Sequence, residues 1–383
     1  MNVYLDNAAT TKLDPRILKA MMPYLSDKYG NASSIHSLGQ QNNLVLERAR
    51  GEIAGILGGE ANGIIFTSGA SEANNFIIRG LMRANRQKGK HLIVSAIEHP
   101  SVYQTAKLLV LEGYEIDFAP VTADGSVDLV ALKRLLRSDT VLVSIMAVNN
   151  EIGSIQDLSV ISKIVHKNGS YFHSDLVQAV PYLKINLQKI GIDLASLSAH
   201  KFYGPKGVGL AYVRSGIKID PLISGGEQEN GLRAGTYNLP GIIGLTEALR
   251  IAYAERASYL RQVKTLRGYF WQRLKTEIPG LKLNGSLKKR VENNLNVRFG
   301  RIEGEAVLMD LSMHGIQVST GSACSAHNLK GSYVLSAIGL ADYDLNSNIR
   351  FSLGRFNTKK EIDYTISVLK KTVARLRAFS PVK

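Results

Sequence analysis

The sequence has little cysteine and no long apolar run, and each shortage excludes a class of protein. One of its 383 residues is a cysteine, Cys324, so neither an intrachain disulfide nor a cysteine-based metal site can form. The HExxH zinc motif is missing too, and we expect no resident metal. No run of about 18 apolar residues is present, which excludes a membrane-spanning helix. The first residues lack the pattern of a signal peptide, so we expect a cytoplasmic protein.

Acidic residues are also scarce, at 32 against 47 lysines and arginines, which gives a net charge of +15. Most of the excess lies in residues 253–383, which hold 22 basic and 10 acidic residues. Such a segment suits an acidic protein partner or a nucleic acid, and a solvated surface is the alternative. The basic residues are dispersed among few aromatics, with one tight cluster at 288–290, which argues against direct nucleic-acid binding.

The chain is long enough for about two domains, and its first part alternates between strand and helix patterns. Helices near 15–25 and 40–57 come first. Such alternation predicts right-handed crossovers and a mostly parallel sheet, whose ligands gather beyond the carboxyl ends of the strands. We expect strands at 63–67, 91–97, 114–121, 140–148, 171–175, 193–199 and 209–214, with helices at 101–112, 128–137 and 157–168.

After Gly225 and Gly226 the pattern changes. Residues 240–276 are expected to form one long helix, with apolar residues at helical spacing that indicate core packing. Strands at 294–299 and 347–353 and helices at 303–314 and 359–377 then predict a smaller α+β unit. We expect a large domain over residues 15–252 and a small domain formed by residues 1–14 and 253–383.

The most informative stretch runs from Ser196 to Gly207. It reads as a strand end followed by Lys201, with Gly204 and Pro205 breaking regular structure directly afterwards. A lysine just past a strand end is well placed to form an imine with an aldehyde such as pyridoxal phosphate (PLP). The alternative is a solvated lysine at the start of a loop.

Other predicted strand ends carry groups that complement such a lysine. Ser71 at a helix N-terminus suits a phosphate, and His99 suits stacking on an aromatic ring and moving protons. Asn150 offers an amide to a cofactor hydroxyl or a substrate carboxylate. Asp175 can pair with a pyridine nitrogen, and Gln178 can donate to a ring oxygen. Each has an ordinary alternative, such as a helix cap, a loop histidine or a turn, but together they are the parts that PLP needs.

Several segments, taken together and in this order, resemble the NifS/IscS-type cysteine desulfurases, members of the class-V aminotransferase family with fold type I. The resemblance covers nearly the whole chain. It implies an α/β fold with a mostly parallel sheet in a large domain plus a smaller α+β domain. The segments that carry it are Leu5–Thr11, Thr67–Glu72, Glu98–Pro100, Val148–Gly153, Ser198–Lys201, Gly231–Thr236 and Ser319–Ser325.

The resemblance also implies a role for each candidate residue. Lys201 would bind PLP covalently and act as a catalytic base, and His99 would stack on the ring and carry a proton. Asp175 and Gln178 would contact the ring. Asn150 would contact the cofactor and the substrate carboxylate. The remaining residues would bind the phosphate (Ala70, Ser71, Ser198, His200), the substrate carboxylate (Arg350) and the phosphate of the other subunit in a homodimer (Thr236).

Cys324 lies among small and polar residues, which favours a reactive thiol over a buried, inert one. The resemblance implies that it takes sulfur from L-cysteine as a persulfide, releasing L-alanine. The sulfur would then pass to an acceptor, either an iron–sulfur scaffold or a tRNA-thiolation protein, and that acceptor is expected to be acidic. The run 324–331 resembles the members whose small domain carries a mobile cysteine loop.

Two residues depart from the family pattern. Glu227 stands where a third glycine is usual, and Asn230 where an arginine is common, which affects the loop near the phosphate contact. Two alternatives stay open. Another fold type I PLP enzyme, such as a selenocysteine lyase or an aminotransferase, would not need Cys324. A basic nucleic-acid-binding protein would bind no PLP.

Overall fold

The structure is a computed structural model that describes residues 1–321 and 331–379. A seven-stranded sheet has the order β2-β8-β7-β6-β5-β3-β4. β8 runs antiparallel to β2 and β7, and the other neighbouring strands are parallel, so the predicted sheet is confirmed. Its strands are β2 (Ile64–Thr67), β3 (His91–Ser95), β4 (Glu115–Ala119), β5 (Thr140–Ser144), β6 (Tyr171–Asp175), β7 (Leu194–Ser198) and β8 (Gly209–Val213).

Several helices of this part begin within one residue of the predicted start, whereas the second begins at Ser37 instead of residue 40 and a short helix at Leu187–Ile190 was not predicted. Asp14, Asp128 and Asp157 each accept a hydrogen bond from a backbone N–H in the first helical turn, so they are the N-caps of α1, α5 and α6. Gly58, in the left-handed conformation, ends α2. The helices are α1 (Pro15–Leu25), α2 (Ser37–Leu57), α3 (Ala70–Ala84), α4 (Pro100–Val110), α5 (Leu129–Leu135), α6 (Leu158–Lys167) and the short α7 (Leu187–Ile190).

β3 and β5 end earlier than predicted, because the chain leaves the sheet there to form loops that carry candidate residues. β3 ends at Ser95 instead of residue 97, and β5 ends at Ser144 instead of residue 148. The second loop still follows the sheet, since Ala147 N donates to Asp175 O at 2.9 Å. The loops that carry His99 and Asn150 therefore lie beside the carboxyl end of β6.

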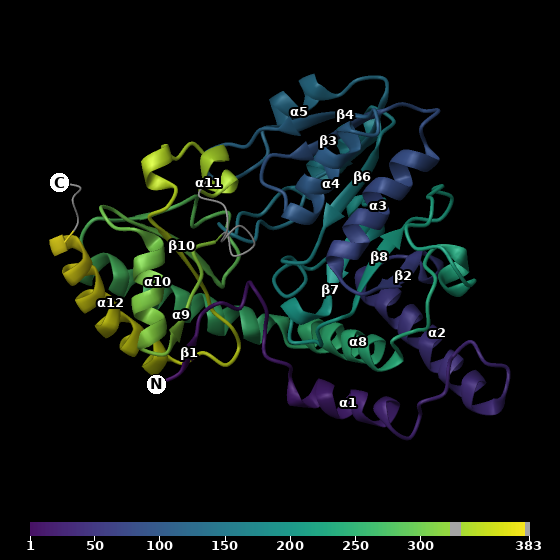
Figure 1. The fold of residues 1–383 in the computed structure, drawn as a ribbon, viewed down its shortest axis with the longest axis horizontal. Helices are drawn as coiled ribbons and strands as arrows, with labels where there is room; N and C mark the ends of the chain where they lie inside the picture. Colours follow the sequence, from purple (N-terminus) through teal and green to yellow (C-terminus); the bar gives the residue numbers. More distant parts are fainter. Residues whose placement is uncertain (322–330, 380–383) are drawn as a thin grey trace.

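The last part of the chain contains the predicted strands and helices near 294–299, 303–314, 347–353 and 359–377, and it adds short strands that the sequence did not predict, so that two smaller sheets form. One sheet has the antiparallel order β12-β10-β9, and the other pairs β1 with β11 in parallel. Figure 1 shows β10, α9, α10 and α12 together at one end of the molecule, with the N-terminus. The elements are β1 (Val3–Tyr4), β9 (Leu281–Leu283), β10 (Asn294–Phe299), α10 (Gly304–Met313), β11 (Ile316–Gln317), α11 (Tyr333–Ala337), β12 (Asn348–Ser352) and α12 (Lys359–Phe379).

The long helix predicted over residues 240–276 is wrong in one respect, because it is broken in two. α8 (Leu239–Ala254) ends at Glu255, whose backbone leaves the helical conformation (φ −95°, ψ 2°), and α9 (Arg256–Glu277) follows. The Glu255 carboxylate pairs with Arg16 at 2.5 Å and with Arg355 at 3.4 Å. These partners from distant parts of the chain hold the break in place.

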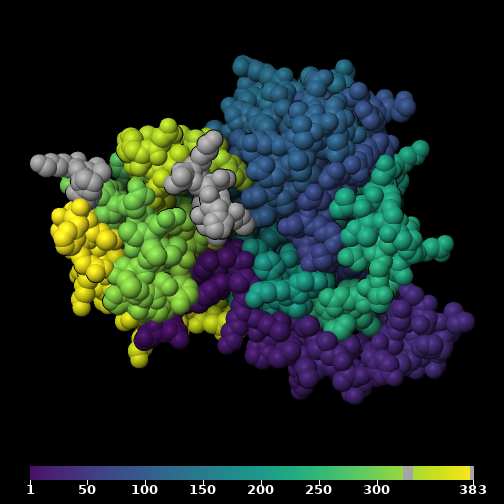
Figure 2. Space-filling view, in the orientation of Figure 1, coloured from purple at the N-terminus to yellow at the C-terminus, as the bar shows by residue number. Residues whose placement is uncertain are grey.

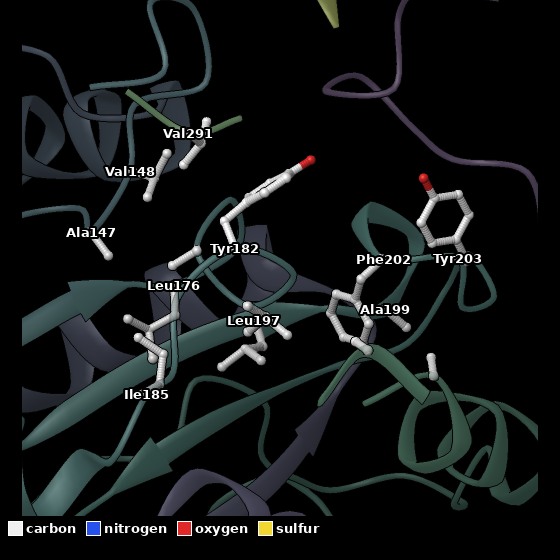
Figure 3. Close-up of a cluster of buried hydrophobic side chains, with 14 of the residues drawn as sticks. Ala147, Val148, Leu176, Tyr182, Ile185, Leu197, Ala199, Phe202, Tyr203 and Val291 are labelled. Carbon is white, nitrogen blue, oxygen red and sulfur yellow. The ribbon is translucent and has the colours of Figure 1, made fainter. Parts of the chain in front are cut away.

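The main core lies behind the strand ends that carry the candidate residues. Figure 3 shows Leu197, Ala199 and Phe202 within one buried cluster, and all three are at most 1% exposed. Ala199 is the first residue of the turn η2 (Ala199–Lys201) and Phe202 follows its last, so their burial fixes the backbone that carries Lys201. Within the described residues, no helix is long and apolar enough to cross a membrane.

The N-terminal segment 5–14 joins the two parts of the chain. Figure 2 shows its purple residues between the green and yellow C-terminal part and the teal part of the large sheet. Thr11 N donates to His200 O at 2.9 Å, and Asp14 N donates to Tyr203 O at 3.0 Å. Asp6 forms a bridge with Ser352 of β12. The segment thus contacts both the Lys201 turn and the small antiparallel sheet.

Candidate active site

Lys201 lies at the end of the turn that follows β7. Its Nζ donates to two backbone carbonyls of the N-terminal segment, Ala8 O at 2.9 Å and Ala9 O at 2.7 Å. The amine is half-buried, and the fixed turn and the two carbonyls hold it in one place. This gives the lysine a defined direction, which a solvated loop lysine would lack.

Asp175 is the last residue of β6, the neighbour of β7, and Gln178 lies in the loop that follows. Asp175 Oδ1 accepts from Val177 N at 2.9 Å, and Oδ2 accepts from Asn74 Nδ2 at 2.9 Å. Gln178 Nε2 donates to Ala8 O at 2.9 Å, the same carbonyl that Lys201 contacts. The carboxylate is 4% exposed and held at both oxygens, so its orientation is fixed.

His99 is the N-cap of α4, and its Nδ1 accepts from Ser101 N at 3.2 Å. Burial lowers the pKa of His99, the nearby Asp175 carboxylate opposes that shift, and the Lys201 ammonium adds to it. The ring is therefore neutral at neutral pH. Hydrogen bonds through Asn74 and Ser101 connect His99 to Asp175. Lys201 shares the Ala8 carbonyl with Gln178, three residues after Asp175, so the three candidate groups lie in one region.

The N-terminus of α3 offers free backbone N–H groups near these residues. Its N-cap, Gly69, has no side chain to cap them, and a Cβ added there would meet Ser198 Oγ at 3.7 Å. Ala70 and Ser71 open the helix. An uncapped helix N-terminus beside a hydroxyl suits a phosphate group, and so this part of the site fits PLP.

His200 lies next to Lys201 and faces the N-terminal segment. Its Nδ1 is 3.0 Å from Thr10 Oγ1. Burial, together with the charges of Lys201 and Lys206, lowers the pKa of His200 to about 4, so the ring is neutral. A neutral His200 can offer a hydrogen bond to a phosphate but no positive charge.

Arg350 contacts Asn150, as expected of two residues that would bind one carboxylate, but through the backbone oxygen of Asn150 and not through its side-chain amide. Arg350 Nη1 donates to the backbone oxygen of Asn150 at 3.0 Å, and Nη2 pairs with Asp6 at 2.7 Å. Its Nε is buried and has no hydrogen-bond partner among the described residues. A substrate carboxylate at this arginine would share it with Asp6, a partner that sequence reasoning missed.

Thr236 does not lie within the group around Lys201. It is exposed and, with Ser68 and Gly207, lines a cavity of about 230 Å³. The loop before it is held by a buried pair, Arg50 Nη1 with Glu229 Oε2 at 2.8 Å. Asn230 has a left-handed backbone (φ 56°), which asparagine adopts more readily than arginine.

Sequence reasoning also missed several residues that support the site. Asn74 and Ser101 hold Asp175 and His99, and they stand in helices whose pattern shows only amphipathic packing. Glu98 is fully buried, and burial raises its pKa to about 8. Only their positions in the sequence could have pointed to Glu98 and Ser101, since both lie close to His99.

Cys324 lies outside the described residues.

Comparison with known proteins identifies the family. Residues 3–365 match the family model described as aminotransferase class-V. The chain belongs to the aminotransferase class-V family. As a class-V enzyme it is PLP-dependent, and the predicted fold type I and cofactor are confirmed.

Among class-V relatives, two curated proteins named cysteine desulfurase IscS match over their full length. The one from Dictyoglomus turgidum is 46% identical over 381 residues, 100% of this chain and 97% of the relative. The one from Methanosarcina thermophila is 44% identical over 380 residues, with coverage of 99% and 94%. A solved NifS-like protein has a TM-score of 0.93 at 38% identity, covering 98% of this chain and 100% of its own.

Proposed function

We propose that this protein is a PLP-dependent cysteine desulfurase that converts L-cysteine to L-alanine and carries the sulfur as a persulfide on Cys324. The observation that carries this proposal is the meeting of Lys201, His99 and Asp175 at the carboxyl ends of adjacent strands and loops. It is supported by the full-length relatives named cysteine desulfurase.

The cofactor would be held by three kinds of contact. Lys201 would bind its aldehyde, and the N-terminus of α3 would hold its phosphate, with Ala70, Ser71, Ser198 and His200 around it. Asp175 would pair with its ring nitrogen, Gln178 and Asn150 would contact its oxygens, and His99 would stack on the ring. When bound, PLP supplies an electron sink for the substrate α-carbon.

The remaining chemistry belongs to side chains of the chain. Arg350, with Asn150, would bind the substrate carboxylate, and Lys201 Nζ would take up the α-proton. The Cys324 thiolate would attack the substrate sulfur, so that an S–S bond forms and the C–S bond breaks. The electron pair of that bond stays with the carbon skeleton, which leaves as alanine after the β-carbon has taken up a proton and Lys201 has returned a proton to the α-carbon. His99 would be the proton carrier for the substrate thiol.

Assembly and location complete the proposal. The enzyme acts in the cytoplasm as a homodimer, in which Thr236 would reach the cofactor phosphate of the other subunit. The large domain spans residues 15–252, and residues 1–14 and 253–383 form the small domain that carries Cys324. The acceptor is an acidic iron–sulfur scaffold or tRNA-thiolation protein.

Two substitutions test this function. Lys201→Ala should abolish alanine release from L-cysteine, and borohydride reduction followed by peptide mapping should label Lys201 in the unmodified enzyme. Lys206→Ala, an exposed lysine of the next turn, is the matched control and should keep the label and the activity. Cys324→Ala should retain PLP but lose alanine release. If that variant still releases alanine, the protein is another fold type I PLP enzyme.

A further inference from the structure

A chain of hydrogen bonds connects the carboxylate of Asp175 to the imidazole of His99 through two side chains that the proposed function does not use. Asn74 Nδ2 donates to Asp175 Oδ2 at 2.9 Å and to Ser101 Oγ at 2.9 Å. Ser101 Oγ lies 2.8 Å from His99 Nδ1. We propose that Asn74 and Ser101 are positioning residues that hold Asp175 and His99 together and keep His99 as the neutral Nε2–H tautomer. The role of this network in catalysis rests on the proposed function.

The orientation of the Asn74 side-chain amide follows from its contact with the Asp175 carboxylate. A carboxylate oxygen of Asp175 only accepts hydrogen bonds, so it is the amide nitrogen of Asn74 that faces it. That nitrogen has two hydrogens, and the second goes to Ser101 Oγ. Ser101 therefore accepts at its oxygen, and its own hydroxyl hydrogen is left to donate to His99 Nδ1.

His99 Nδ1 receives two donors, the hydroxyl of Ser101 and the backbone N–H of the same residue at 3.2 Å. A ring nitrogen that accepts carries no proton, so in neutral His99 the proton is on Nε2. Protonation of Nδ1 would break the bond from the backbone N–H and would require the Ser101 hydroxyl to turn round and accept. It would also place a positive charge at the N-terminus of α4, which the helix dipole disfavours. The charged groups that act on the ring from other elements are Asp175 of β6 and Lys201 of η2.

One detail separates this network from ordinary packing of a buried asparagine. Asn74 is fully buried, and its Oδ1 has no donor within the described part of the chain. A buried acceptor without a donor is costly, so an asparagine that served packing alone would gain little over an apolar residue. Asn74 instead uses both hydrogens of its amide on Asp175 and Ser101. In this arrangement His99 begins the reaction as a donor at Nε2.

The test is nitrogen NMR of the holoenzyme labelled with ¹⁵N-histidine, with His99 assigned by its loss in His99→Gln. In the unmodified enzyme, Nδ1 should resonate as an unprotonated nitrogen and Nε2 as a protonated one across neutral pH. Asn74→Ala and Ser101→Ala should raise the pKa of His99 and broaden or shift both signals. Ser101→Thr, which keeps the hydroxyl, should restore them. Asn85→Ala is the matched control, because it alters the C-cap of α3, the helix that carries Asn74. It should leave the His99 signals unchanged.

Activity gives a second readout. In Asn74→Ala, kcat for alanine release should fall about 10-fold, as expected for the loss of one hydrogen bond to a charged group. The proposal is overturned if His99 carries its proton on Nδ1, or if the Asn74→Ala and Ser101→Ala signals match those of the unmodified enzyme. Because the tautomer is read without turnover, these outcomes are distinct from a failure of the desulfurase function, which would appear as no alanine from the unmodified enzyme.

Discussion

At the scale of single residues, Glu98 shows how the fold sets the charge state of a group beside the site. Its side chain is fully buried, and its Oε1 accepts from Ser95 Oγ and from Met146 N, both at 2.6 Å. Oε2 is buried and has no partner among the described residues. Burial, with a smaller contribution from the Asp175 charge, raises the pKa of Glu98 from 4.5 to about 8. The folded protein therefore holds the Glu98 proton more tightly than the unfolded chain does.

This shift predicts a pH dependence of stability. A carboxyl whose pKa is raised by folding contributes stability below its unfolded pKa and loses it as pH rises through the folded value. Relative to the unmodified protein, Glu98→Gln should therefore gain stability between about pH 4.5 and pH 8. Urea unfolding at several pH values in this range measures the difference, and the exposed Glu52→Gln on α2 is the control. Parallel curves for Glu98→Gln and the unmodified protein would contradict the prediction.

The residues at strand ends could be predicted, and the residues that support them could not. Asp175 ends an apolar strand, and Lys201 and His99 lie three and four residues beyond one, so their place at the sheet edge follows from the strand pattern. Asn74 and Ser101 instead act through hydrogen bonds between helices α3 and α4 and strand β6. Which helical side chains meet across a sheet depends on packing, and a single sequence carries no signal for that.

At the scale of elements, α11 shows how one short helix is held on two site loops. Ser332, its N-cap, accepts from Leu335 N at 3.2 Å and donates to the buried Glu151 Oε2 at 2.6 Å. Tyr333 OH donates to Glu98 O in the loop that carries His99. The sequence did not predict α11, since five residues are too few for a helical pattern.

The double role of Ser332 gives a prediction for this element. Ser332→Ala removes an N-cap and leaves a buried carboxyl without its donor, so the free energy of unfolding should fall by about 2 kcal/mol. Urea unfolding of the holoenzyme measures it. The control is Ser367→Ala, whose exposed hydroxyl bonds to Tyr364 O within α12. An equal effect of the two substitutions would show that the Glu151 contact contributes nothing.

The break between α8 and α9 could not be predicted for a similar reason. Apolar spacing continues across Glu255, and nothing near it in sequence stops a helix. Its partners Arg16 and Arg355 come from opposite ends of the chain. The spacing did predict the packing correctly, since Val263 and Phe270 are fully buried.

At the scale of the whole molecule, the structure corrects the view of the basic C-terminal part. The adjacent residues 288–290 are not one surface cluster, because Arg290 is 4% exposed and donates to Asn294 Oδ1 at 2.7 Å. Burial lowers its pKa to about 9. Lys289 is exposed but pairs with Asp124 at 3.1 Å. Charge reversal as a surface probe is therefore suited to Lys288 and Lys289 and not to Arg290.

The net charge of this part predicts how sulfur transfer responds to salt. Steering of an acidic acceptor weakens as the Debye length falls from about 10 Å at 0.1 M to about 3 Å at 1 M salt. Sulfur transfer from Cys324 to the acceptor should slow with added salt, while persulfide formation from L-cysteine should barely change. Stopped-flow measurement of the two half-reactions separates them. If both half-reactions responded equally to salt, the basic residues would form only a solvated surface and would not steer the acceptor.

The path of the N-terminal segment has a consequence for synthesis of the chain on the ribosome. Residues 6–9 are translated before the strands of the large sheet, yet Asp6 pairs with Arg350 and contacts Ser352, which are translated after all of those strands. At about 5–20 residues per second, the wait lasts tens of seconds. During this time the large sheet can form, but the carbonyls that hold Lys201 are not anchored on β12. The nascent chain thus anchors these carbonyls only when β12 has been translated, so the surroundings of Lys201 are completed after the large sheet that carries it.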